Sequence, residues 1–173
     1  MSDPETLYAS KIKHTGPFEF KEFYRWCYDF LGEETKLKVT EDRYIEKQGP
    51  EVKGLDIFWT GSREITHYFK FEVKIQWKIL GMKDIEIQKE GQKIKMQTGS
   101  CEIKLKGTLV RDYKHQFEEA NWKTPFRDIY NKWVIPARIE EFEDKLIADC
   151  NNFLDQAKAY LELEGQRGGV IQI

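Results

Sequence analysis

The longest regular pattern in the chain is an alternation of apolar and polar residues between positions 64 and 79. One face of this stretch carries Ile65, His67, Phe69, Phe71, Val73, Ile75, Trp77 and Ile79. Successive side chains of a strand point to opposite faces of its sheet, so the alternation predicts a long antiparallel strand with one buried and one exposed face. A sheet that contains such a strand needs other elements to cover its apolar face.

Shorter alternations on both sides of this segment predict further strands. A first strand is expected over residues 5–13, and a helix follows it. Six strands in a meander are then expected over residues 37–48, 55–59, 64–79, 85–87, 94–96 and 101–113. Turns are expected where glycine interrupts the alternation, at residues 49–50, 61–62, 81, 90–91 and 99–100.

Two stretches with apolar residues at three- and four-residue steps predict the helices that cover this sheet. The first helix is expected to begin at Pro17 and to end at Gly32. The second is expected over residues 137–164, with Pro136 separating it from a helical segment at residues 124–134 and Gly165 ending it. Five residues of the long helix are expected to face the sheet: Ile139, Phe142, Leu146, Phe153 and Tyr160. Three are expected to be exposed: Glu140, Glu143 and Asp144.

The predicted fold class is α+β, with the elements in the order strand, helix, six-strand antiparallel meander and long C-terminal helix packed on the curved sheet. A chain of 173 residues suits a single hydrophobic core. We therefore expect one domain over residues 1–164 and a flexible C-terminal tail over residues 165–173.

This element order, over residues 5–164, resembles the helix-grip fold shared by START lipid-transfer domains, polyketide cyclases and plant pathogenesis-related proteins. Two stretches, HTGPFEFKEFYRWCYDFL and KWVIPARIEEFEDKL, are similar to an uncharacterised group of small archaeal proteins. The helix-grip resemblance implies a cavity between the sheet and the long helix that holds an apolar ligand. Because a fold does not determine a function, this implication is an analogy.

Five residues are candidates for the lining of such a cavity: Trp59, His67, Trp77, Arg111 and Tyr113. Their positions in the alternation place all five on the predicted apolar face. Ligand pockets combine aromatic walls with a few polar groups, as this set does. The alternative for His67 and Arg111 is a position at the rim of the sheet, in contact with solvent, and we favour the rim.

The sequence offers no constellation that points to catalysis, a metal or a cofactor. None of the three histidines stands at metal-ligand spacing from another histidine or a cysteine. The acidic runs are adjacent rather than convergent, and the glycines are scattered at turns. We therefore expect no catalytic residue, metal ligand or cofactor, and an enzyme is not favoured. Hydrolase or cyclase chemistry would require His67 or Arg111 inside the cavity.

Positive charge is concentrated in the middle of the chain, although the formal net charge is only −2. Seven lysines fall on the exposed face of the predicted sheet: Lys70, Lys74, Lys78, Lys93, Lys95, Lys104 and Lys106. We interpret them as a solvated face that prevents edge pairing, and a surface for phosphate or lipid headgroups is the alternative. Nucleic acid is not an expected partner, because that face has almost no aromatic residues for base stacking.

No apolar run approaches the ~18 residues of a membrane-spanning helix. The N-terminus lacks a signal segment, and the three cysteines are far apart, so we expect a cytoplasmic location. The leading hypothesis is a non-enzymatic module that binds an apolar small molecule or lipid between the sheet and the C-terminal helix. The alternative is an interaction or assembly subunit. It would use the long acidic helix or the apolar tail, through Val170, Ile171 and Ile173.

Overall fold

The computed structural model of the chain describes residues 5–111 and 136–169. Its elements are β1 (Glu5–Phe18), α1 (Phe20–Glu33), β2 (Lys38–Gln48), β3 (Lys53–Glu64), β4 (Phe69–Lys89), β5 (Gln92–Arg111) and α3 (Pro136–Gly169). The helical segment predicted at residues 124–134, the candidate Tyr113 and the tail residues 170–173 lie outside the described residues.

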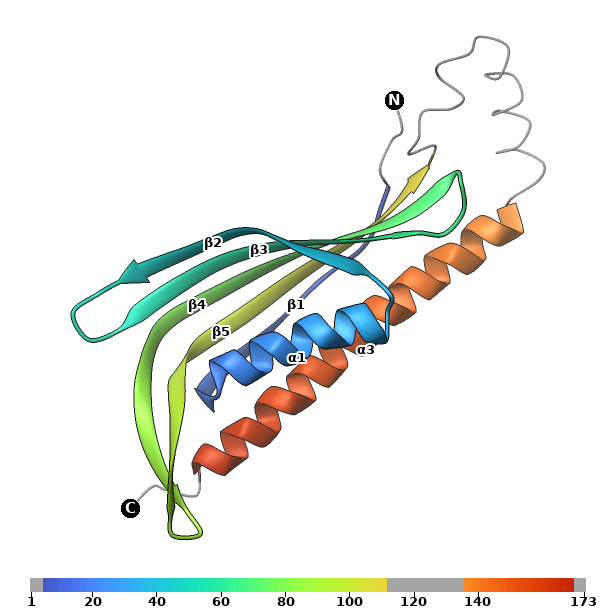
Figure 1. Cartoon of the computed structure of the whole chain (residues 1–173). Coiled ribbons are helices and arrows are strands. Elements are labelled where there is room, and N and C mark those ends of the chain that lie inside the picture. The colour runs from blue at the N-terminus through green and yellow to red at the C-terminus, as the bar shows by residue number, and fades with distance from the viewer. Residues whose placement is uncertain (1–4, 112–135, 170–173) are drawn as a thin grey trace.

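Five strands form one antiparallel sheet in the order β1-β5-β4-β3-β2. The first strand pairs with the last, so β1 and β2 are the two edges. Both helices lie on one side of this sheet, and α3 runs along β1 (Figure 1). The predicted α+β class, with an antiparallel sheet, a short helix and a C-terminal helix, is confirmed.

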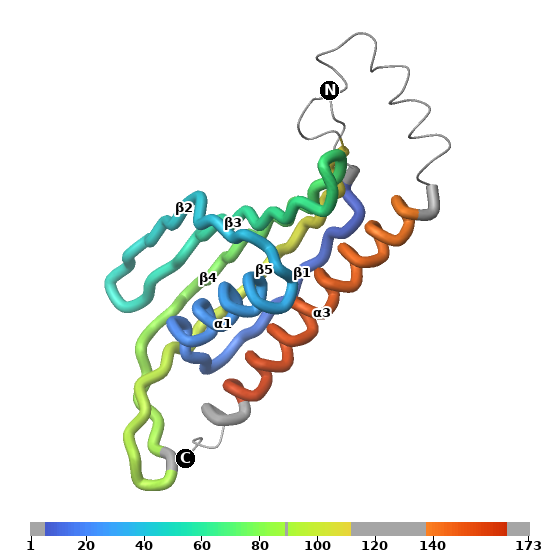
Figure 2. Tube along the Cα trace, turned by 45° about the vertical axis from the view of Figure 1, so that its right-hand side comes forward, coloured from blue at the N-terminus to red at the C-terminus, as the bar shows by residue number. Residues whose placement is uncertain are grey.

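Four strands follow α1 in the described residues, rather than the six expected. β4 includes the strand predicted at residues 85–87, and β5 includes the strand predicted at residues 94–96. Gly81 bends β4 instead of ending it: its φ is +62°, and the pairing with β5 shifts between Leu80 and Lys83. A bulge of this kind bends a strand while the ladder continues beyond it. The outer parts of β4 and β5 therefore curve together into one long hairpin (Figure 2).

The turn before β4 lies at residues 65–68, not at residues 61–62. β3 continues past the predicted turn because its pairing with β4 is regular there. Thr66 shapes the actual turn, since its hydroxyl accepts hydrogen bonds from the backbone amides of Tyr68 (3.1 Å) and Phe69 (3.0 Å). The turn interrupts the alternation. Tyr68 is consequently buried and His67 exposed, the reverse of their predicted faces.

The first helix also begins and ends later than predicted. Pro17 belongs to β1, an edge strand in which a missing amide donor is tolerated. The helix begins at Phe20, whose amide donates a hydrogen bond to the side-chain oxygen of Gln97 (3.0 Å). At its other end α1 passes through Gly32, and the left-handed residue is Lys36, with φ +58°.

The long helix begins at Pro136 and continues through Gly165 to Gly169. A Cβ atom at Gly165 would lie 3.0 Å from Cε1 of His14 on β1. This glycine therefore allows a close approach of α3 to the sheet edge and does not end the helix. The predicted tail boundary moves accordingly, since residues 165–169 are helical.

The core lies between the sheet and the two helices. One stripe of α3 is buried against the sheet and includes Leu146, Cys150, Phe153, Ala157 and Leu161. Three further predicted residues, Ile139, Phe142 and Tyr160, pack against this core and are half-buried. The expectation that Glu143 is exposed is wrong: its carboxylate lies 4.0 Å from the guanidinium of Arg111 and is half-buried.

Truncation of the buried stripe of α3 is expected to destabilise the fold. Leu146→Ala or Phe153→Ala should lower the free energy of unfolding by about 2–5 kcal/mol, because each leaves a cavity in a packed core. Glu140→Ala, on the exposed face of α3, should change it by no more than about 0.5 kcal/mol. Urea unfolding followed by circular dichroism measures all three changes.

The same variants show whether α3 serves its own sheet or a partner chain. The stripe is buried within one chain, so the urea midpoint of Leu146→Ala should be the same at protein concentrations about tenfold apart. A midpoint that rises with protein concentration would contradict burial within one chain.

Candidate functional site

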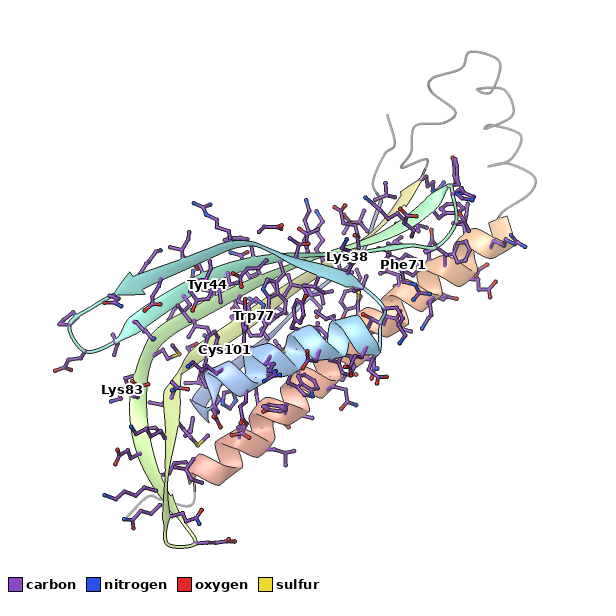
Figure 3. All side chains as sticks on the ribbon, viewed as in Figure 1. Lys38, Tyr44, Phe71, Trp77, Lys83 and Cys101 are labelled. Atoms are coloured by element: carbon purple, nitrogen blue, oxygen red, sulfur yellow. The ribbon has the colours of Figure 1, made fainter. Side chains whose placement is uncertain are left out.

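Trp59 and Trp77 lie in the aromatic layer between the sheet and α1. Both side chains are buried, and their ring centroids are 5.1 Å apart. The ring of Tyr24 lies 4.8 Å from that of Trp59, and the ring of Phe23 lies 5.5 Å from that of Trp77. Figure 3 shows Trp77 between the sheet and the helices. These two candidates are brought together as core residues that attach α1 to the sheet.

Hydrogen bonds fix one of these tryptophans in place. The indole N–H of Trp59 donates to the hydroxyl of Tyr24 (2.8 Å), and that hydroxyl donates to the carboxylate of Glu41 on β2. Burial and the bond to Glu41 raise the pKa of Tyr24 well above its ordinary value, so the hydroxyl stays protonated and can donate. Nε1 of Trp77 has no hydrogen-bond partner in the described part of the chain.

A hollow of about 130 Å³ lies at the edge of the sheet between β1 and α3, where Ile12, His14 and Leu161 line it. The cavity in the interior, among the described residues between the sheet and the helices, measures about 10 Å³ and is lined by residues that include Phe71, Leu146 and Phe153. That volume is on the order of what one water molecule requires. A small-molecule site typically has ~300–1,000 Å³. The predicted position of an apolar ligand is therefore filled by side chains, as far as the structure describes it.

His67 and Arg111 lie at the rim of the sheet. His67 is exposed in the turn between β3 and β4, and Arg111 ends β5 beside Glu143. Neither residue borders the interior cavity. The condition for hydrolase or cyclase chemistry, a histidine or arginine inside that cavity, is therefore not met by these two residues.

A hollow of about 720 Å³ lies on the opposite face of the sheet, which neither α1 nor α3 covers. It crosses β1, β5, β4 and β3 and reaches β2 at one side. We call it the lysine groove. Its lining residues are Ala9, Ser10, Lys11, Asp42, Phe58, Trp59, Thr60, Lys74, Ile75, Gln76, Lys104, Leu105 and Lys106. A volume of this size is typical of small-molecule sites.

Lysines from three strands lie directly opposite one another in the lysine groove. Lys74 of β4 pairs with Lys106 of β5, and Lys104 of β5 pairs with Lys11 of β1. Like charges directly opposite each other destabilise a sheet, by roughly 0.2–1 kcal/mol per pair. The groove therefore concentrates positive charge at a cost to the fold.

One carboxylate offsets the positive charge of the Lys11–Lys104 pair, and the Lys74–Lys106 pair has no such partner among the described residues. Glu102 lies 3.8 Å from the ammonium of Lys11 and 3.5 Å from that of Lys104. In residues 5–111 and 136–169, no ion pair or hydrogen bond joins the ammonium of Lys74 or Lys106 to another side chain. The Lys74–Lys106 pair is thus positioned to hold an anion.

Apolar and acidic groups surround this cationic centre. The ring of Phe58 is half-buried on the open face, and Ala9 lies opposite Lys106. The aliphatic stems of lysines add further apolar surface. Thr60 donates a hydrogen bond to the carboxylate of Asp42 (2.5 Å) at the β2 side. The groove can therefore accept a ligand with an anionic group and an apolar part.

Part of this site could be found from the sequence. The alternation places Lys74, Lys104 and Lys106 on the open face, and a phosphate or headgroup surface was the alternative interpretation of that face. Lys11 and Asp42 were missed because only the strand register brings them to the same place. Phe58, an aromatic residue at a position where the alternation calls for a polar one, was the signal in the sequence.

Buried thiols are poorly suited to catalysis. Cys27, Cys101 and Cys150 are all free and buried. Burial raises the pKa of Cys101 and of Cys150 to about 12, and it also raises the pKa of Cys27. In the part of the chain that the structure describes, no cluster of His, Cys, Asp and Glu could hold a metal ion.

No protein-family model matches the chain, and no curated protein or solved structure is significantly similar to it. None of the described helices has the length and apolar character needed to cross a membrane. The lysine groove is therefore the feature from which a function can be inferred.

Removal of one charge from the opposed lysines is expected to stabilise the fold. Lys106→Gln should raise the free energy of unfolding by up to about 0.5 kcal/mol, because it relieves repulsion with Lys74. Lys93→Gln, in the hairpin end of β5, removes a lysine that faces Gln88 and should give no such gain. Urea unfolding at low ionic strength measures the difference, and a loss of stability in Lys106→Gln would contradict it.

The buried thiols are expected to be unreactive in the folded protein. The thiolate is the reactive form, and a pKa of about 12 leaves almost none of it near neutral pH. An aromatic disulfide reagent should therefore label the native protein slowly and the urea-unfolded protein rapidly. Rapid labelling of any thiol in the native protein would contradict the described burial.

Proposed function

We propose that the protein is a non-enzymatic binding module that holds a small anionic ligand with an apolar part in the lysine groove. The observation that carries this proposal is the pairing of Lys74 with Lys106 inside a hollow of about 720 Å³. An anion bound between two like charges relieves their repulsion, and its binding therefore stabilises the folded protein. Phe58 supplies the apolar contact that distinguishes an amphiphilic anion from a simple one.

The proposal keeps the binding module expected from the sequence and moves its ligand to the other face of the sheet. Element order and a helix-covered antiparallel sheet support the helix-grip resemblance as part of the proposal. The interior cavity of about 10 Å³ and the edge hollow of about 130 Å³ are both much smaller than the lysine groove of about 720 Å³, which favours the open face as the ligand site. Free, buried cysteines support a cytoplasmic location as a further part of the proposal.

An assembly subunit is the second candidate function, and the described residues favour it less. The apolar stripe of α3 is buried against its own sheet, and Leu163 is the large hydrophobic residue left exposed on the described part of that helix. The apolar tail at Val170, Ile171 and Ile173 lies outside the described residues. The ligand-binding proposal therefore comes first.

Calorimetric titration with decyl phosphate, below the concentration at which it forms micelles, tests the proposal. We expect the protein to bind decyl phosphate, and to bind decanol and inorganic phosphate much more weakly, because each lacks one part of the ligand. The double variant Lys74→Gln/Lys106→Gln should lose about tenfold or more in affinity. Affinity should also fall as the salt concentration rises.

The matched control removes two lysines of the same sheet outside the groove. Lys93→Gln/Lys95→Gln has the same net charge as the groove variant and alters the hairpin end of β5. This control should bind decyl phosphate as the unmodified protein does. Equal affinities of the two double variants would show that net charge alone attracts the ligand and would overturn the proposal.

A further inference from the structure

Asp42 gives the lysine groove an acidic wall because of an irregularity in β2. The register between β2 and β3 shifts between Glu41 and Arg43, so Asp42 is the extra residue of a bulge. Glu41 is directed to the helix side, where it accepts a hydrogen bond from Tyr24, and Arg43 lies opposite Phe58. A bulge re-aims a side chain. In β2 it places the Asp42 carboxylate at the groove.

This carboxylate is only partly used by the protein. Its Oδ2 accepts the hydrogen bond from Thr60, at 2.5 Å. Among the described residues, Asp42 forms no ion pair and its Oδ1 accepts no hydrogen bond. A carboxylate therefore borders a groove whose centre is positive, and no cation of residues 5–111 and 136–169 is paired with it.

The acidic wall and the lysine pair lie within reach of one small ligand. Thr60, which holds Asp42, lies directly opposite Lys74, and Lys74 lies opposite Lys106. Neighbouring strands are about 4.8 Å apart, and one strand, β3, separates Asp42 on β2 from Lys74 on β4. A ligand with a short link between its two charged groups can therefore contact the ammonium of Lys74 and the carboxylate of Asp42, because the long lysine side chain covers part of the distance. A ligand in the groove meets positive charge at one end and negative charge at the other.

On the premise that the lysine groove binds an anionic ligand, we propose that this ligand is a zwitterion. Its phosphate lies between Lys74 and Lys106, and its ammonium group donates a hydrogen bond to Oδ1 of Asp42. An apolar part of the ligand lies along Phe58. The chemical class is a phosphate ester of an amino alcohol. A primary ammonium suits the site because it brings N–H donors to the carboxylate.

Two phosphodiesters that differ only in the ammonium group test the charge arrangement. We expect decyl phosphoethanolamine to bind the unmodified protein about tenfold more tightly than decyl ethyl phosphate, both measured calorimetrically below micelle formation. Asp42→Asn should remove this preference. Asp56→Asn, on the same face of β3 but outside the groove, should retain it.

The outcomes separate this proposal from its premise. If decyl phosphate binds but the two diesters bind equally, or if Asp42→Asn keeps the preference, the zwitterion is overturned and the proposed function stands. If none of the decyl compounds binds, both are overturned. Free phosphoethanolamine tests the apolar contact. Much weaker binding than that of the decyl ester supports a lipid as the ligand, and comparable binding overturns the contact with Phe58 that the proposed function requires.

Discussion

Burial of one face of the sheet under both helices is the constraint on which the rest of the structure depends. α1 and α3 lie on the same side of the sheet (Figure 1), and their apolar stripes pack against it in one hydrophobic core. The opposite face is left without a helical cover in the described residues. A tightly packed core and an open, hollowed face are thus two results of the same arrangement. The larger hollow therefore lies on the open face of the sheet, whose side chains are not part of the hydrophobic core.

Faces of the strands could be predicted from the sequence because a strand has a strict two-residue period. Val73, Ile75 and Trp77 are buried as the alternation requires, and Lys74 and Lys78 are exposed. Strand ends could not be predicted in the same way. A glycine in an alternating segment fits a turn or a bulge equally well, and the pairing partner decides between them. At Gly81 the ladder with β5 continues beyond the glycine, so the strand bends instead of ending.

Positions of the candidate site residues depended on contacts between elements that are distant in the sequence. Trp59 and Trp77 resemble the wall of a pocket when the sheet is considered alone, but Phe23 and Tyr24 of α1 occupy the space in front of them. The lysine groove, in contrast, is formed by residues that the sequence alone does not bring together. Lys11 joins it from β1, more than ninety positions from Lys106, and only the strand order β1-β5-β4 makes them neighbours.

The bulge at Asp42 also changes what the edge strand β2 offers to another chain. An edge strand offers a row of unpaired amides and carbonyls onto which another chain can add. β2 is such an edge, and nearly all of its side chains are exposed, several of them charged. An extra residue in the middle of the strand twists it and breaks the regular spacing that an added strand would need. One irregularity in the backbone therefore has two consequences: it places the Asp42 carboxylate at the lysine groove, and it makes the exposed edge less suitable for the addition of another strand.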